Sequence, residues 1–211
     1  MPGIRNNTIR EFRERIARFD RAYVNDWDAW LRTLALNRPH QLGVVLRRWQ
    51  ACRPNRMRRT QAVDAHDPPY LEQLIDESAT HLYSLRAFDI RLASSFTQTA
   101  YSALVALWGI FEQLSYQGKV RGGLAGGVGI SKAVLLLSDG RVGPAFDSQV
   151  RGHLRLATIN SANAWISALQ AVNQDIQAYE LANATTLQRS TPDYAHLHSG
   201  RIYDMTLGPR A

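Results

Sequence analysis

The chain has 211 residues, of which 45% are hydrophobic and 20% are charged. Those proportions are typical of one globular domain and exclude an intrinsically disordered protein. No apolar run approaches the ~18 residues that a membrane-spanning helix needs, and the opening residues lack the apolar core of a signal peptide, so we expect a cytoplasmic protein. Cys52 is the single cysteine, which excludes an internal disulfide and a metal site built from several cysteines.

The net charge of +7 is unevenly distributed along the chain. Residues 1–60 carry 14 arginines against 5 acidic residues, whereas residues 61–211 carry 11 basic residues against 13 acidic ones. A basic N-terminal third is typical of a surface that binds a polyanion, and we expect the partner to be a nucleic acid. A solubilising face in an arginine-preferring genome is the alternative. We expect one domain, made of a basic helical segment at 1–60 and a helical body at 61–211.

Lysine is rare in this chain. Of the 25 basic residues 23 are arginine, and the exceptions are Lys119 and Lys132. Arginine can replace lysine in most phosphate contacts, but it cannot supply an amine that loses its proton. An amine nucleophile would therefore have to be one of these two lysines or the chain terminus.

Helical periodicity runs through the first third of the chain. Thr8 and Glu11 have the spacing of a capping box, and an apolar stripe follows at intervals of three and four residues, made of Ile9, Phe12, Ile16, Phe19 and Tyr23. We expect a second helix that Asp26 caps, and a third at about residues 40–51. The segment 53–59 is too basic for a core and predicts a loop in which Arg58 and Arg59 contact DNA.

The remaining two thirds also favour helices. We expect one after Asp67-Pro68-Pro69, a long central one at 86–116, a short apolar one at 130–137 and a last long one at 161–182. Pro144-Ala145-Phe146 leads into a further helix that Asp147 or Ser148 caps, and a tail with two histidines closes the chain. Since we find no repeat and no convincing strand, we predict an all-α fold in one globular domain.

A glycine-rich segment at 118–129 precedes the short apolar helix. Glycines let a backbone approach an anion closely, and free amides at a helix start point toward it, so the segment is compatible with phosphate binding. The spacing matches neither a Walker A loop nor a Rossmann turn. A flexible loop is the alternative interpretation.

The run from Gly127 to Lys132 (GVGISK), an apolar helix and the run from Pro144 to Arg151 (PAFDSQVR) together resemble the helix–hairpin–helix DNA glycosylase superfamily. The resemblance extends from Trp108 to Leu154 and is greater to divergent members with an 8-oxoguanine DNA glycosylase-type fold. Members of the superfamily share a G-V-G hairpin, a lysine just inside the next helix in bifunctional enzymes, and an essential aspartate further along. Here the proline that usually precedes G-V-G is absent, and Phe146 stands where a tryptophan is usual.

The resemblance implies a helix–hairpin–helix-like element and excision of a damaged or modified DNA base without a cofactor, in repair or in defence against foreign DNA. Lys132 would attack the sugar and form a Schiff base, and Asp147 would stabilise the oxocarbenium-like state. The DNA contacts that the resemblance implies are Gly127, Gly129, Ser131, Arg121 and Arg151. The base pocket that it implies consists of Trp108, Phe146 and Trp165.

Plainer interpretations accompany these hypotheses. Asp147 could be an ordinary helix cap, Lys132 a surface lysine, and the two tryptophans core residues. The spacing of His196, His198 and Asp204 suits no common zinc motif, so we predict no metal. A non-catalytic nucleic-acid-binding module would place Lys132 and Asp147 far apart or facing away from any cleft. A structural subunit of a larger assembly would expose the apolar stripe from Ile9 to Tyr23.

Overall fold

The computed structural model describes residues 3–52, 57–60, 70–115 and 124–210, and this part of the chain is helical, with isolated bridges in place of strands. The α-helices are α1 (Ile9–Ala17), α2 (Arg21–Leu31), α3 (Arg38–Arg48), α4 (Leu71–Ser84), α5 (Gln98–Phe111), α6 (Gly127–Leu137), α7 (Ser148–Leu154), α8 (Ala162–Asn183), α9 (Leu187–Ser190) and α10 (Ser199–Leu207). The prediction of an all-α fold is confirmed.

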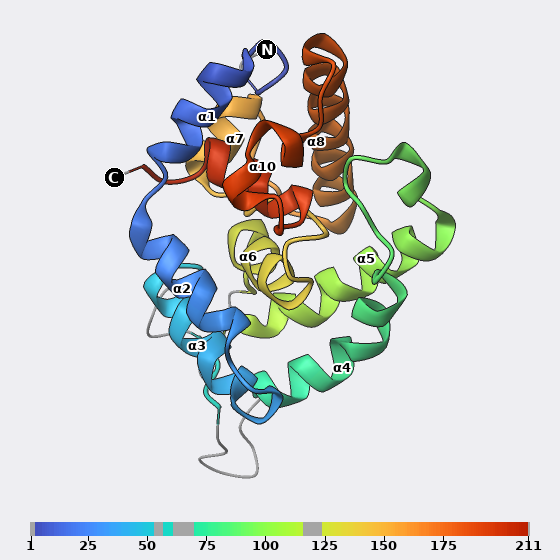
Figure 1. The fold of residues 1–211 in the computed structure, drawn as a ribbon. Helices are drawn as coiled ribbons and strands as arrows, with labels where there is room; N and C mark the ends of the chain where they lie inside the picture. The colour runs from blue at the N-terminus through green and yellow to red at the C-terminus, as the bar shows by residue number, and fades with distance from the viewer. Residues whose placement is uncertain (1–2, 53–56, 61–69, 116–123, 211) are drawn as a thin grey trace.

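Helix α6 lies at the centre of the molecule (Figure 1), with α1, α7, α8 and α10 on one side and α2 to α5 on the other. Both α3 and α5 contact it directly. Its side chains from Ile130 to Leu136 are at most 4% exposed. The apolar character of α6 on all faces therefore reflects a helix that other helices surround.

The basic segment and the rest of the chain share one hydrophobic core. Phe12, Trp30 and Leu46 belong to the same buried cluster as Leu104 and Ile176. The indole of Trp30 also donates a 2.9 Å hydrogen bond to the carbonyl of Leu136 at the end of α6. The helices before residue 60 are thus packed into the body of the protein.

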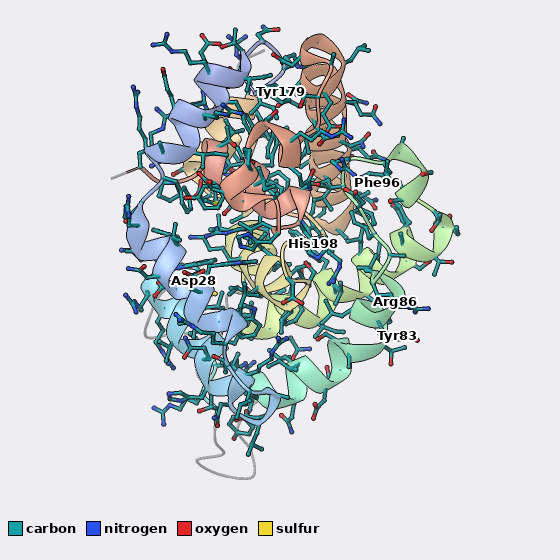
Figure 2. The ribbon with its side chains drawn as sticks, in the orientation of Figure 1. Asp28, Tyr83, Arg86, Phe96, Tyr179 and His198 are labelled. Atoms are coloured by element: carbon teal, nitrogen blue, oxygen red, sulfur yellow. The ribbon has the colours of Figure 1, made fainter. Side chains whose placement is uncertain are left out.

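Helix α1 begins with the predicted capping box, which is confirmed. The Thr8 side chain accepts from the Glu11 amide, and the Glu11 carboxylate accepts from the Thr8 amide. The apolar stripe of α1 is covered within the molecule, because α9 and α10 contact this helix and Phe12 stacks on Tyr179 of α8 with ring centroids 4.8 Å apart. Figure 2 labels Tyr179 on α8. Phe12, Ile16 and Phe19 are all buried.

Helix α2 begins earlier than predicted, and Asp26 does not cap it. Asp20 is the N-cap, and its carboxylate accepts from the Ala22 amide at 2.8 Å. Asp26 lies within the helix, where it accepts from the Trp49 indole at 3.0 Å and pairs with Arg48 at 2.8 Å. A carboxylate with these long-range partners is stable inside a helix, so its capping potential is not used.

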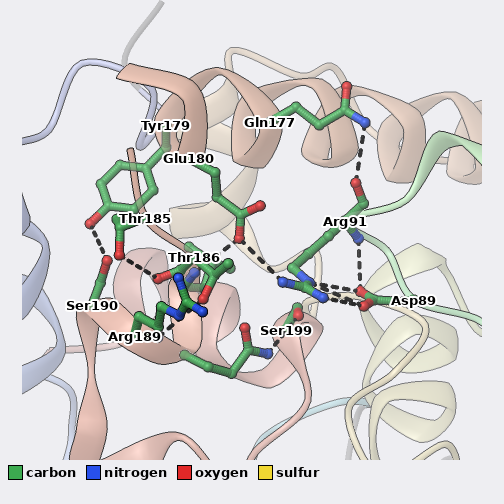
Figure 3. Close-up of polar contacts among 12 residues, drawn as sticks. Asp89, Arg91, Gln177, Tyr179, Glu180, Thr185, Thr186, Arg189, Ser190 and Ser199 are labelled. Carbon is green, nitrogen blue, oxygen red and sulfur yellow. Dashed lines mark hydrogen bonds and ion pairs between the residues drawn. The ribbon is translucent and has the colours of Figure 1, made fainter. Parts of the chain in front are cut away.

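The prediction of one helix over 86–116 is wrong, because α4 ends at Ser84 and α5 begins only at Gln98. Between them Asp89 organises a turn, since its carboxylate accepts from the Arg91 amide and guanidinium and its own amide donates to Ser95. Such local side-chain bonds compete with the helical pattern. Gln177 of α8 then holds the turn by donating to the Arg91 carbonyl (Figure 3).

Two further boundaries differ from the predictions. Helix α6 starts at Gly127, three residues before the expected Ile130, so the G-V-G run forms its first turn. The expected tail contains the buried helix α10, whose residues from Ser199 to Leu207 are nearly inaccessible. The predicted helix start at Asp67-Pro68-Pro69 lies outside the described residues, and the first helical residue after it is Leu71.

Candidate active site around Lys132

Lys132 lies in the second turn of the central helix α6 and is only 4% exposed. Its ammonium donates a short hydrogen bond to the carbonyl of Trp49 and lies 6.0 Å from the centre of the Tyr23 ring. Burial lowers the pKa of Lys132, and the charges of Asp147, Asp204 and the thiol of Cys52 partly oppose this shift. Because desolvation disfavours the ammonium form, this amine loses its proton more readily than an exposed lysine does.

Asp147 is the N-cap of α7, as the sequence predicts. Its Oδ1 accepts from the amides of Gln149 and Val150, each at 2.9 Å. Both bonds end on Oδ1, and Oδ2 accepts no hydrogen bond from the described residues. The side chain as a whole is half-buried. Burial lowers the pKa of Lys132 and raises that of Tyr23, and in both cases the negative charge of Asp147 acts to raise the pKa. Lys132 and Asp147 are therefore close enough for the charge of Asp147 to affect the protonation of Lys132.

The start of α7 is fastened to α6 by backbone-to-side-chain bonds. The Phe146 amide donates to Ser131 Oγ at 2.9 Å, and that hydroxyl donates to the Val128 carbonyl. Ser131 precedes Lys132 and Phe146 precedes Asp147, so this bond sets the spacing between the lysine and the aspartate. Ser131 is 2% exposed, so in this structure it positions the pair and is not open to a DNA phosphate.

A second carboxylate supports the same loop. Asp204 of α10 accepts from the Ala145 amide at 2.9 Å, and Arg201 forms an ion pair with it in the core. Burial raises the pKa of Asp204, whereas Arg201 and the bond from the Ala145 amide lower it. The sequence analysis considered Asp204 only as a candidate metal ligand beside His196 and His198, because nothing in its spacing indicates a contact with Ala145, 59 positions away.

The N-terminal third supplies residues to this site that the sequence did not reveal. Tyr23 of α2 stacks on Trp49 with ring centroids 5.3 Å apart, and Cys52 follows shortly after Trp49. Burial raises the pKa of Cys52 to about 11, and the charge of Lys132 opposes this shift. The thiol beside the lysine is therefore almost wholly protonated at neutral pH. The sequence showed only that Cys52 is the single cysteine, and this does not indicate that it lies beside Lys132.

The glycines of the predicted hairpin pack closely against other segments. A Cβ atom on Gly129 would lie 2.9 Å from Cys52 Sγ and 3.0 Å from the Ala51 carbonyl, and one on Gly127 would lie 2.8 Å from the Ile159 carbonyl. Both positions require glycine for this close approach. Gly126 caps α6 without a side-chain hydrogen bond, so no cap side chain covers the amides of the first turn.

The aromatic residues expected to form a base pocket are packed in the core. Trp108 and Trp165 are 5% and 1% exposed, with ring centroids 6.1 Å apart, and Phe146 is 0% exposed. The indole of Trp108 donates to Glu112 at 2.7 Å. Stacking of a nucleobase on these rings would need them to be uncovered first. The half-buried Tyr23 is the aromatic ring that the structure places beside Lys132.

The expected DNA-contacting arginines occupy different settings. Arg151 is half-buried on α7, and its guanidinium lies 3.5 Å from the Thr158 hydroxyl. Arg58 donates to the Gln113 carbonyl at 2.7 Å, whereas the Arg59 side chain is exposed. Arg121 lies outside the described residues, as do residues 118–123 of the glycine-rich segment and residues 53–56.

The histidines of the C-terminal region do not gather around a carboxylate. His196 and His198 are exposed, whereas Asp204 is buried. In the described part of the chain no group of three or more metal-ligating side chains could hold an ion. Within the same residues no helix is long and apolar enough to cross a membrane. A cavity of about 560 Å³ lies elsewhere, between Arg13, Phe19 and Tyr194, and neither Lys132 nor Asp147 lines it.

Comparison with protein-family models, with curated proteins and with solved structures gave no match to this chain. A functional hypothesis must therefore rest on the residues and geometry around Lys132. The resemblance to helix–hairpin–helix glycosylases continues to rest on the sequence motifs alone.

Proposed function

We propose that this protein is a DNA N-glycosylase, with lyase activity, that uses Lys132 as nucleophile and Asp147 as the stabilising carboxylate. The observation that carries the proposal is the enclosed amine of Lys132, with a pKa lowered by burial, held within electrostatic range of Asp147. Enclosure favours a neutral, nucleophilic amine, and a neighbouring carboxylate suits a cationic transition state. A buried lysine without a role would be unusual, because burial of an amine is unfavourable.

The chemistry assigns each residue one task. The amine of Lys132 leaves the Trp49 carbonyl and attacks the anomeric carbon of the deoxyribose. The N-glycosidic bond breaks, and the base leaves with its electron pair and takes up a proton. Asp147 stabilises the positive charge that develops on the sugar ring, through the oxygen that the helix amides leave open. Ring opening then gives a Schiff base between lysine and sugar, which permits strand cleavage by elimination.

Substrate access is the step that needs movement. Lys132 is 4% exposed, so the sugar reaches it only if Tyr23, Trp49 or the α7 loop shifts. Base excision also requires the nucleotide to leave the DNA stack. A damaged base in cellular DNA and a modified base in foreign DNA are both consistent with this chemistry, and the expected location is the cytoplasm, on DNA.

The test is borohydride trapping on duplex oligonucleotides that carry an abasic site or one of a panel of modified bases. We compare the wild type with Lys132→Arg, which keeps a cation beside the Trp49 carbonyl but cannot form a Schiff base. We expect a covalent adduct in the wild type and none in Lys132→Arg. Asp147→Asn keeps an oxygen for capping and loses the charge, and we expect base release to fall by about 10²–10⁴-fold.

Three outcomes separate the hypotheses. An adduct that survives in Lys132→Arg would reject Lys132 as the nucleophile. Base release without any adduct would reject the lyase step and leave Asp147 to act on a water molecule. Tight DNA binding with neither product would favour a non-catalytic nucleic-acid-binding protein.

A further inference from the structure

A second concave site lies away from Lys132, where α1, α7 and the C-terminal segment meet. We call it the arginine pocket; it has a volume of about 330 Å³ and is lined by Asn7, Glu11, Glu14, Arg15, Arg18, His153 and Arg210. A backbone bridge between Phe19 and Arg210 holds the end of the chain beside α1. Figure 1 shows the C-terminus next to α1, with α7 behind them. Side chains from three distant parts of the sequence thus converge on one hollow.

The acidic residues of the arginine pocket already have partners of their own. Glu11 accepts from the Thr8 amide and hydroxyl at 2.7 and 3.0 Å in the capping box. Glu14 pairs with Arg10 at 2.9 Å, outside the pocket lining. Within the described part of the chain, no ion pair joins Arg15, Arg18 or Arg210 to a carboxylate. The lining therefore holds three arginines and one histidine against two carboxylates, and Glu11 and Asp175 raise the pKa of Arg15 without forming an ion pair with it.

Unsatisfied donors point to the same conclusion. Nη1 of Arg15 and Nδ2 of Asn7 are buried and have no hydrogen-bond partner. Burial and the charge of Arg210 lower the pKa of Arg15, and burial together with Arg15 and Arg210 lowers the pKa of His153. A protein that holds mutually repelling cations around unpaired donors gains stability when an anion enters.

We propose that the arginine pocket binds a phosphoryl group, held by Arg15, Arg18 and Arg210. Guanidinium groups match the oxygens of a phosphate with paired, charge-assisted hydrogen bonds. Convergence of several cations suits an anion with several equivalent oxygens better than one with a single carboxylate. The volume of about 330 Å³ is at the small end of ligand sites, which fits one phosphoryl group with its neighbouring atoms.

The phosphoryl group could belong to a DNA backbone or to a small phosphate compound. The pocket includes His153, which lies on the same short helix as Asp147, and the charge of Asp147 acts on His153. A backbone phosphate in this position would lie near the proposed catalytic carboxylate. The inference needs no base excision, so the two proposals stand or fall separately.

The experiment measures binding to the full chain in two arms at fixed protein concentration, without any turnover. The first arm is calorimetric titration with inorganic phosphate and pyrophosphate at constant ionic strength. The second is the salt dependence of binding to an undamaged DNA duplex. The test variant is Arg18→Gln/Arg210→Gln, and the matched control is Arg32→Gln/Arg86→Gln, which removes the same charge outside the pocket lining. Circular dichroism verifies that each variant is folded.

We expect the test variant to bind pyrophosphate at least about tenfold more weakly than the wild type, with little change in the control. If the ligand is a DNA backbone, the slope of log affinity against log salt falls by about 0.9 for each phosphate that the test variant no longer neutralises, and the control keeps the wild-type slope. Weaker phosphate binding with unchanged DNA binding identifies a small phosphate compound as the ligand. Equal effects of both double variants in both arms, or no saturable phosphate binding by the wild type, would overturn the inference.

Discussion

At the scale of single residues, burial is the main influence on the protonation of the Lys132 amine. The ammonium donates to the Trp49 carbonyl and lies near the Tyr23 ring. Burial lowers the pKa of Lys132 and outweighs the opposing charges of Asp147, Asp204 and Cys52. A lysine whose pKa is lower in the folded than in the unfolded chain makes the stability of the protein depend on pH.

The sign of this dependence gives the first prediction. Between the lowered pKa of Lys132 and its ordinary value of 10.5, the unfolded chain binds more protons at this residue than the folded one. The contribution of Lys132 to stability therefore rises with pH across this window. We expect the free energy of unfolding of the wild type, relative to Lys132→Met, to increase with pH as the pH approaches 10.5 from below in urea titrations. A difference that stays constant or decreases with pH would show that the lysine is not desolvated.

Glycine positions in the predicted hairpin give the second prediction. Gly129→Ala forces a Cβ atom to within 2.9 Å of Cys52 Sγ, so we expect it to destabilise the fold by about 1–3 kcal/mol. Gly152→Ala is the control, since a Cβ there meets nothing within 4 Å and alanine is the better helix former inside α7, which should stabilise by about 0.5–1 kcal/mol. Thermal unfolding of both variants measures the two effects. Similar effects at both positions would exclude close packing as the reason for Gly129.

At the scale of elements, buried carboxylates fasten helices to distant segments. Asp175 of α8 is 0% exposed and accepts from the Ile4 amide at 2.6 Å, from Arg5 Nε at 2.9 Å and from the Tyr203 hydroxyl at 2.7 Å. One side chain thus joins the N-terminal segment, α8 and α10. Burial, followed by the charge and hydrogen bond of Asp175, raises the pKa of Tyr203 well above its usual range.

The third prediction concerns the loss of stability when Asp175 is replaced. Asp175→Asn leaves Arg5 and the Ile4 amide without a charged acceptor, and we expect a loss of about 2–4 kcal/mol in the free energy of unfolding. Arg10→Gln is the comparison, because it breaks the exposed ion pair of Arg10 with Glu14 and should change stability by less than about 1 kcal/mol. Urea denaturation of the two variants distinguishes the junction from a surface pair, and equal effects would contradict the assignment.

At the scale of the whole molecule, Arg201 joins the two groups of helices that flank α6. Its guanidinium is 1% exposed and lies 4.6 Å from the Trp27 ring and 5.6 Å from the Trp49 ring. It also donates to the Tyr23 carbonyl and pairs with Asp204. Since Asp204 in turn holds the loop before Asp147, this buried pair connects the overall packing with the candidate active site.

The fourth prediction is that Arg201 and Asp204 contribute to the stability of the protein jointly and not independently. Arg201→Met leaves Asp204 buried without its cation, and we expect it to destabilise the protein by about 3–5 kcal/mol. Arg201→Met/Asp204→Asn removes both charges and should be less destabilised than Arg201→Met alone. The free energies of the two single variants and the double variant form a thermodynamic cycle that measures the coupling. Additive losses would show that the two residues act independently.

Local spacing in the sequence determined the helical class and several helix starts. The capping box at Thr8 and Glu11 and the cap at Asp147 are hydrogen bonds between residues at most three positions apart, so they are visible in the sequence. Lys132 and Asp147 were proposed from a motif that spans a short stretch of chain, and their catalytic roles stay a prediction. Spacing did not show that 86–97 leaves the helical path, because partners on α8 help to hold that turn.

Only the tertiary structure decided how the site is enclosed. The Trp49 carbonyl lies 83 positions from Lys132, the Ala145 amide 59 positions from Asp204, and Asp175 171 positions from Ile4. No periodicity of three or four residues carries information over such separations. Burial depends on which helices meet, and burial is what lowers the pKa of Lys132. The same meeting of distant segments places three arginines around one pocket.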